Sequence, residues 1–147
     1  MRFATEHDLQ RLLAFLGQAG VSTENVDTLF SQFMIEEDEQ GQMKVAIGYE
    51  RAGEEALLRS LVLSQRMNPL DILEFLQTFL GRLKMRGITN VYVLAKHKDL
   101  PLFHMFGFEA VEKVPKQITD IPHFQRNVRN DCIVLNCQLF TKLSTIL

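Results

Sequence analysis

The pattern of apolar and polar residues predicts a series of helices and strands along a chain of 147 residues. Arg2 to Thr5 is a short extended candidate at the start of the chain. Apolar residues then recur at helical spacing from Leu9 to Leu16, and Gly20 marks the end of that helix. A second helical pattern runs from Val26 to Phe33. The chain up to Phe33 therefore predicts one strand and two helices.

Three apolar stretches then predict strands joined by tight turns. Met34 to Asp38 and Met43 to Tyr49 flank the turn signal Glu39-Gln40-Gly41-Gln42, which is typical of a hairpin. A second turn at Arg51-Ala52-Gly53 precedes the run from Ala56 to Ser64. That run is short, apolar and bounded by turn residues, as expected of a buried strand.

A strong helix start follows the third of these strands. Asn68 fits an N-cap, Pro69 fits the first helical position, and Asp71 supplies an acid in the first turn. The helix carries leucine and phenylalanine on one face and ends near Arg86-Gly87. Ile88 to Ala95 is the next buried strand. A strand, a helix and a strand in this order favour a right-handed parallel crossover.

The remaining residues predict a short helix and two more strands. The helix begins at Leu100 and ends before Gly107, and the strand candidates are Phe108 to Val114 and Cys132 to Phe140. The connection from Pro115 to Asp131 is interpreted as a loop with no more than one helical turn. The order of elements predicts an α/β (α+β) fold in one domain that spans residues 1–147.

The composition of the chain limits the kinds of molecule that it is expected to bind and the cell compartment in which it is expected. The formal net charge is −2, so no overall positive field favours nucleic acid or an anionic membrane. Basic residues do concentrate between Arg82 and Arg129, which suits an anionic cofactor but is equally typical of a solvated face. No apolar run approaches the roughly 20 residues of a membrane span, and the first residues carry charges. We expect a cytoplasmic protein.

The two cysteines are not expected to pair with each other. Cys132 and Cys137 are five positions apart in a predicted strand, and an odd spacing puts them on opposite faces. Nothing in their spacing resembles a zinc site, so we expect no metal. Two small thiols in a reducing compartment is the interpretation that this pattern favours.

Two stretches of the sequence have a recognisable order and spacing. The first is the predicted strand Leu58-Arg59-Ser60-Leu61-Val62-Leu63, with its following helix and the strand Ile88 to Leu94. The second is Phe103-His104-Met105-Phe106-Gly107-Phe108-Glu109-Ala110-Val111, which has the form F-x-x-x-G-F-x-x-V. Together they resemble the GNAT (acyl-CoA N-acyltransferase) superfamily. The resemblance implies a mixed central sheet of about six to seven strands, flanked by about four helices.

The C-terminal part is similar to small members of that family that acetylate amino acids. Val114-Pro115-Lys116-Gln117-Ile118, followed by Phe124 and Cys132, resembles the endings of glutamate N-acetyltransferase-like domains. The resemblance implies an acetyl-CoA-dependent N-acetyltransferase that acts on the primary amine of a small molecule, by direct transfer in a ternary complex. Members of the family often form homodimers, so a homodimer is also an expectation.

The loop that binds the cofactor pyrophosphate in this family has no glycine in this chain. Its expected position reads Gln65-Arg66-Met67-Asn68-Pro69-Leu70-Asp71. Pro69 lacks a backbone N–H, and Asp71 places a carboxylate where an anion would bind. Arg66 is expected to compensate with a charge-assisted contact to the phosphates. The departure keeps an alternative open, namely a GNAT-fold binding or regulatory protein with weakened or lost catalysis.

The resemblance also implies positions for the rest of the cofactor. A backbone N–H near Leu61, Val62 or Leu63 would polarise the thioester carbonyl. Phe103 occupies the place where many relatives have a tyrosine that protonates the leaving thiolate, and Phe106 lies in the same short helix. Lys96 is placed to meet the cofactor phosphates, although an exposed lysine after a strand is also ordinary.

Three charged residues are candidates for the acceptor side of the reaction. Glu54 and Glu55 lie at the entry of the central strand and are candidates for the base that takes the proton of the amine, or else solvated turn carboxylates. Arg59 lies inside a buried strand, where an arginine is costly unless it is paired with an anion. Its partner is either the carboxylate of a substrate or an internal Glu or Asp, unless the side chain is simply exposed on one face of the strand.

Overall fold

The computed structural model describes residues 1–64, 67–129 and 131–139, which fall into two compact units. Met1–Glu50 and Arg59–Leu76 form the first unit, and Arg51–Leu58 and Gln77–Leu147 the second. Two strands and the longest helix contribute residues to both units, namely β3 (Met43–Ala52), β4 (Glu55–Leu63) and α3 (Pro69–Met85). Each unit is therefore described by itself.

The strands form a mixed sheet, as the sequence predicts. The hydrogen-bonded order is β1-β2-β3-β4-β5-β7-β6, seven strands among the described residues. β4 pairs in parallel with β5 (Asn90–Lys96), which confirms the predicted parallel crossover through α3. β7 (Cys132–Gln138) is antiparallel to both β5 and β6 (Glu109–Ala110). The α/β (α+β) class and the expected six to seven strands are confirmed.

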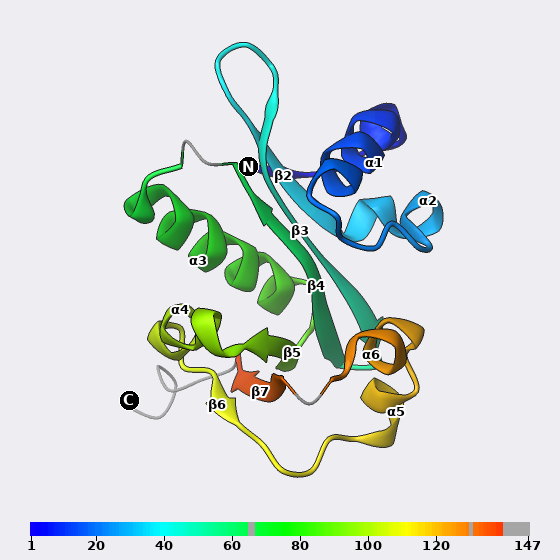
Figure 1. Ribbon diagram of the computed structural model, residues 1–147, viewed down its shortest axis with the longest axis vertical. Coiled ribbons are helices and arrows are strands. Elements are labelled where there is room, and N and C mark those ends of the chain that lie inside the picture. Colours follow the sequence, from blue (N-terminus) through cyan, green and yellow to red (C-terminus); the bar gives the residue numbers. More distant parts are fainter. Residues whose placement is uncertain (65–66, 130, 140–147) are drawn as a thin grey trace. The chain divides into compact units, whose positions relative to one another are not determined.

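In the first unit, two helices cover an antiparallel hairpin. β1 (Arg2–Phe3) pairs with β2 (Phe33–Glu37), and β2 pairs with β3 across the turn that contains Gly41. Apolar side chains of α1 (Leu9–Gln18) and α2 (Val26–Leu29) pack on β2 and β3, and both helices lie beside this hairpin in Figure 1. Fully buried members of this core include Leu12, Leu16, Val26, Phe33 and Ile35.

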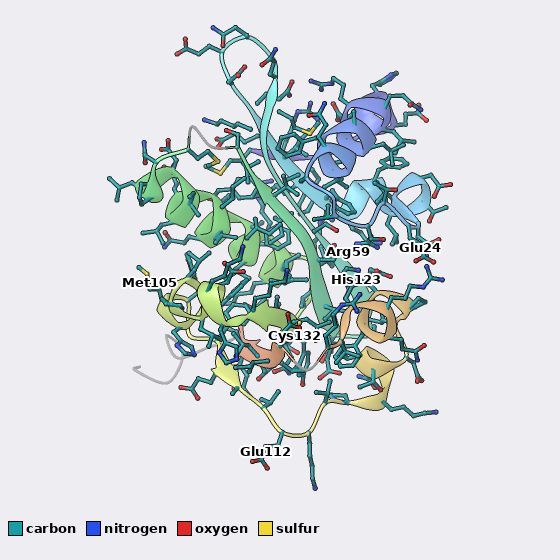
Figure 2. The ribbon with its side chains drawn as sticks, viewed as in Figure 1. Glu24, Arg59, Met105, Glu112, His123 and Cys132 are labelled. Carbon is teal, nitrogen blue, oxygen red and sulfur yellow. The ribbon has the colours of Figure 1, made fainter. Side chains whose placement is uncertain are left out.

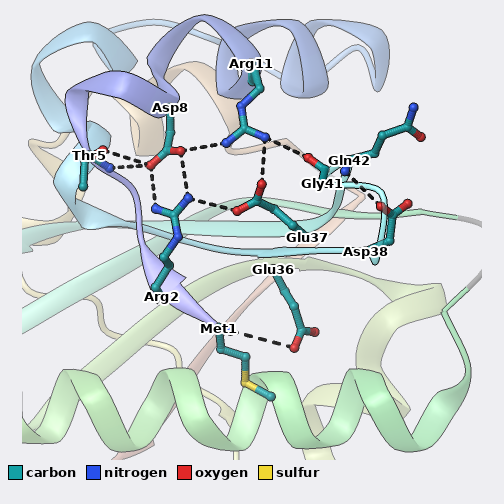
Figure 3. A network of polar contacts seen from close by, with 10 residues as sticks. All are labelled: Met1, Arg2, Thr5, Asp8, Arg11, Glu36, Glu37, Asp38, Gly41 and Gln42. Atoms are coloured by element: carbon teal, nitrogen blue, oxygen red, sulfur yellow. Dashed lines mark hydrogen bonds and ion pairs between the residues drawn. The ribbon is translucent and has the colours of Figure 1, made fainter.

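A charge network ties the first residues to the same hairpin. Asp8 is buried and accepts hydrogen bonds from Arg2 at 2.6 and 2.9 Å, from Arg11 at 2.8 Å and from the backbone N–H of Thr5 at 2.7 Å (Figure 3). The two arginines also donate to Glu37 of β2, at 2.9 and 2.8 Å. The Arg2 guanidinium holds the pKa of the Asp8 carboxyl far below its usual range, with further lowering by Thr5 and Arg11.

In the second unit, two short helices cover β4, β5 and β7. α5 (Lys116–Thr119) and α6 (Pro122–Asn127) bring Ile118, Ile121 and Phe124 onto Leu57 and Tyr92. α4 (Leu100–Met105) precedes β6, and its Phe103 packs edge-on against Phe108 with 5.4 Å between ring centroids. None of the described helices is both long and apolar enough to cross a lipid bilayer.

Three local predictions are wrong. Phe33 begins β2 instead of ending a helix, because the helical pattern stops with α2 and a 3-10 turn, Phe30–Gln32. The connection expected to be a loop contains both α5 and α6, so the described residues hold six α-helices where about four were expected. The strand expected from Phe108 to Val114 is reduced to Glu109–Ala110. The ends of these elements depend on how their side chains pack on the sheet, and the local spacing of apolar residues does not contain that information.

The two cysteines lie as the sequence predicts. Both are free thiols, with Cys132 half-buried and Cys137 buried. They are five residues apart within β7 (Cys132–Gln138), and because side chains alternate along a strand, the two thiols lie on opposite faces. The Cys137 thiol donates to the carbonyl oxygen of Phe106 at 3.4 Å, and Cys132 contacts the carbonyl oxygen of Asn127 at 3.7 Å.

Candidate functional site

β4 contains a left-handed residue in the middle of an otherwise extended strand. Ser60 has φ +59°, which is uncommon for a residue with a Cβ and costs of the order of 1 kcal/mol. The strand is buried at four successive positions before it, from Ala56 to Arg59, so the alternation of faces is broken at this point. A kink of this kind changes the direction of the backbone groups and side chains that follow it in the strand, here those of Leu61, Val62 and Leu63.

Arg59 is buried beside this kink with an internal carboxylate as its partner. Its Nη1 donates to Oε2 of Glu50 on β3 at 2.9 Å, and its Nη2 donates to the carbonyl oxygen of Ser22 at 3.2 Å. Its Nε donates to Oγ of Ser60 at 3.2 Å. The guanidinium carbon also lies 5.8 Å from the ring centroid of Phe33. Of the two partners that the sequence allows, the structure thus contains the internal one. Figure 2 shows Arg59 on β4, facing the first-unit loop that carries Glu24.

Arg59 and Glu50 differ in how far a bound molecule could reach their side chains. The side chain of Arg59 is 1% exposed, whereas that of Glu50 is 14% exposed. One carboxylate oxygen of Glu50 is held by Arg59, and within the described residues the other oxygen, Oε1, accepts no hydrogen bond. The solvent-facing member of the pair is therefore the carboxylate. The sequence analysis missed Glu50, although an acid directly after a buried run, here residues 45–49, is a usable signal.

The start of α3 is formed by the residues that the sequence predicts. Asn68 caps the helix, because its Oδ1 accepts the backbone N–H of Asp71 at 2.9 Å and its carbonyl oxygen accepts that of Ile72 at 3.2 Å. The side chain of Asn68 also donates to the Asp71 carboxylate at 3.0 Å. Pro69 has no N–H, so Leu70 supplies the remaining donor of this turn.

The other loop candidates fall partly outside the described residues. Gln65 and Arg66 lie outside them, so the expected contact of Arg66 with phosphate stays a prediction. Met67 is half-buried, and its N–H donates to the carbonyl oxygen of Ser64 at 3.3 Å. The N–H of Ser64 in turn donates to the backbone carbonyl oxygen of Lys44 on β3 at 2.8 Å, which fixes the exit of β4 against the hairpin.

Glu54 and Glu55 lie in the second unit and have different surroundings. Glu54 is exposed, and its backbone carbonyl accepts the N–H of Thr89 at 2.7 Å. The Glu55 carboxylate receives the Tyr92 hydroxyl at 3.3 Å on one oxygen and the side-chain amide of Gln117 on the other. Burial raises the pKa of Tyr92, and the Glu55 carboxylate raises it further. Both oxygens of Glu55 are therefore already engaged.

The remaining cofactor candidates also lie in the second unit. Lys96 is exposed at the end of β5. Phe103 is buried against Phe108, so its ring belongs to the packing beneath α4. Phe106 follows α4 as its C-cap, and its carbonyl oxygen accepts the thiol of Cys137.

Comparison with curated proteins gives a relative that matches most of the chain. No family model matches the chain. The uncharacterized protein YwlB of Bacillus subtilis (strain 168) is 32% identical over 137 residues, which cover 92% of this chain and 93% of YwlB. The chain belongs to the YwlB family.

Solved structures show that this YwlB-family chain has the GNAT fold. N-acetylglutamate synthase from Neisseria gonorrhoeae, solved with coenzyme A and N-acetyl-glutamate, matches 95% of the chain with a TM-score of 0.76 and 19% identity. The chain spans about a third (35%) of the length of that protein. A GNAT-family acetyltransferase from Staphylococcus aureus Mu50 matches 93% of the chain and 96% of its own length, with a TM-score of 0.69 and 12% identity.

Proposed function

We propose that this YwlB-family protein is an acetyl-CoA-dependent N-acetyltransferase that acts on the primary amine of a small molecule, with amino acids as the first class to test. The observation that carries the proposal is the fold shared, over 95% of the chain, with an N-acetylglutamate synthase that was solved with coenzyme A and N-acetyl-glutamate. The chain would act as one GNAT-like domain, alone or as a homodimer, and would transfer the acetyl group directly within a ternary complex.

The kinked end of β4 is the proposed place of the thioester. A backbone N–H among Leu61, Val62 and Leu63 would donate to the thioester carbonyl oxygen, where negative charge develops as the amine attacks. Ser60 supports this role, since its left-handed backbone interrupts the regular strand directly before these residues. A backbone donor of this kind requires no particular side chain.

The cofactor phosphates would meet the start of α3. The N–H of Leu70, which has no acceptor among the described residues, and the dipole of the 17-residue helix favour an anion there. Asp71 works against it, because a carboxylate in the first turn repels a phosphate. Arg66 is proposed as the compensating cation, while Lys96, Phe103 and Phe106 of the second unit stay predictions for the rest of the cofactor.

The same helix start favours a second candidate function, a GNAT-fold protein that binds without catalysing transfer. Asn68 already occupies the N–H groups of Asp71 and Ile72, and Pro69 has none to offer. A helix start capped by its own side chains is typical of a structural N-terminus. This reading predicts weak binding of coenzyme A, or none.

Calorimetry with purified full-length protein separates the two functions. We expect acetyl-CoA and coenzyme A to bind, and thiol release to appear with at least one member of a panel of amino acids, polyamines and aminoglycosides. Arg66→Ala should weaken the binding of coenzyme A, and Arg129→Ala is its charge-matched control. Binding without thiol release from any amine would favour the binding protein. Absence of binding at high micromolar acetyl-CoA would exclude the transferase.

A further inference from the structure

We infer that Glu50 is the carboxylate that receives the substrate's amine and takes its proton, and that Arg59 serves to position Glu50. This inference rests on the proposed function and assigns the acceptor side of that reaction. It moves the role of proton acceptor from Glu54 and Glu55, at the entry of β4, to Glu50 of β3.

The exposures decide which member of the buried pair a substrate can reach. Arg59 is enclosed, with a 1% exposed side chain and three different acceptors around its guanidinium. Glu50 retains 14% exposure and an oxygen, Oε1, that no described residue engages. An arriving carboxylate would have to displace Glu50 from Arg59, whereas an arriving ammonium needs only the free oxygen.

The contacts of Arg59 fix that oxygen in place. The bond from Nη1 orients the Glu50 carboxylate, and the bonds to Ser22 and Ser60 fix the guanidinium itself. The Glu50 carboxylate is thereby held in one orientation, which a proton acceptor requires. Arg59 also links Glu50 to Ser60, next to the proposed place of the thioester.

Both oxygens of the Glu55 carboxylate already accept a hydrogen bond. One accepts the Tyr92 hydroxyl and the other the Gln117 amide, so a substrate ammonium would have to share an oxygen with one of these donors. Glu54 is exposed, and no described side chain positions its carboxylate. Glu50 alone among these three acids combines partial burial, a fixed orientation and an open oxygen.

The step balances without any further reactant. The ammonium gives one proton to Oε1 of Glu50, directly or through a water, and the neutral amine attacks the thioester carbon. The C–N bond forms as the C–S bond breaks. The thiolate of coenzyme A takes the second proton from nitrogen, and Glu50 returns its own proton to solvent.

Thiol release with acetyl-CoA and the amine that the panel identifies tests the assignment. Glu50→Gln should lower kcat/KM by about 100-fold and remove the acidic limb of its pH profile, while the affinity for coenzyme A stays unchanged. Glu36→Gln is the matched control, because Glu36 is a partly buried carboxylate of the same unit that is paired with Lys44. This control should keep both the rate and the limb.

Chemical rescue distinguishes a proton acceptor from a structural anion. Added formate or acetate should restore turnover to Glu50→Ala, with acetate, the stronger base, more effective per bound molecule. Equal rescue by chloride, or rescue that follows thermal stability alone, would overturn the inference in favour of a structural ion pair.

The outcomes for the two proposals differ. Wild-type turnover that survives in Glu50→Gln, or an acidic limb that is lost in Glu54→Gln or Glu55→Gln instead, overturns the inference and leaves the transferase in place. Wild-type protein that releases no thiol with any amine overturns the proposed function and this inference together.

Discussion

Gly48 lies directly opposite Phe33 in the β2–β3 pair, and the Phe33 ring fills the space where a Cβ of residue 48 would be. A Cβ built at Gly48 would meet three ring atoms at 2.6 to 2.8 Å, closer than real contacts allow. Phe33 is fully buried, and its ring is the one near the Arg59 guanidinium. The glycine thus lets the aromatic ring lie against the sheet beneath the buried ion pair.

Gly48→Ala should destabilise the protein by about 1–3 kcal/mol, because the enclosed ring has to move. Urea unfolding at neutral pH measures the change in the free energy of unfolding. Gly81→Ala in α3 is the control, since nothing lies within 4 Å of its Cβ position. This control should stabilise the protein by up to about 1 kcal/mol through helix propensity. Equal effects of both variants would refute the close packing at Gly48.

Asp8→Asn should cost about 1–3 kcal/mol, because Arg2 and Arg11 lose their shared buried acceptor. Glu6 is an exposed acid of the same 3-10 turn as Asp8, and Glu6→Gln should change the free energy of unfolding by less than about 0.5 kcal/mol. Urea unfolding of the three proteins makes the comparison. If Asp8→Asn lowered the free energy of unfolding no more than Glu6→Gln does, the charge network would contribute nothing beyond an ordinary surface ion pair.

The same carboxylate predicts a pH dependence of stability. The pKa of Asp8 is lowered on folding, mainly by Arg2, so its contribution is present above the pKa of an unfolded aspartate, about 4. That contribution is lost progressively as the pH falls below this value. Wild-type protein should therefore lose more stability than Asp8→Asn between about pH 5 and about pH 2. Parallel acid-induced losses in both proteins would contradict the prediction.

Tyr92 should ionise above the ordinary pKa of tyrosine, about 10, because burial and the Glu55 carboxylate both disfavour the phenolate. In a Tyr49→Phe background Tyr92 is the remaining tyrosine, and ultraviolet absorbance follows its titration. Glu55→Gln should lower the pKa of Tyr92 without returning it to the ordinary value, since burial is the larger cause. Glu54→Gln should leave it in place, and a shift as large as that of Glu55→Gln would contradict the contact.

Asp71→Asn should tighten the binding of coenzyme A about fivefold, because it removes a carboxylate beside the N–H of Leu70. Glu74→Gln makes the same charge change at an exposed position further along α3, and should alter the affinity by less than about twofold. Titration calorimetry provides both affinities. Unchanged affinity in Asp71→Asn would mean that the phosphates do not approach this helix start.

Periodicity and capping chemistry were sufficient to predict the main elements. The spacing of leucines in α1, the turn signal at Gly41 and the sequence Asn68-Pro69 all act within a few residues, and each is seen as expected. The short helices α5 and α6 were missed because they contribute few turns and depend on packing of Ile118 and Phe124 against β4 and β5.

The candidate site was predictable only in part, for a related reason. The cap at Asn68 and the pairing of Arg59 with some anion follow from local chemistry and from the cost of burying a charge. The identity of that anion does not, because Glu50 and Arg59 belong to different strands and meet only across the sheet.

By itself, the sequence of this YwlB-family protein determined its alternation of strands and helices and its departure from a glycine-rich loop. Only the tertiary structure decided which charged groups meet, which of them is enclosed and which faces solvent. Local patterns reflect contacts between residues a few positions apart. The surroundings of Arg59 instead depend on Glu50, on the neighbouring strand β3, and on the ring of Phe33 on β2.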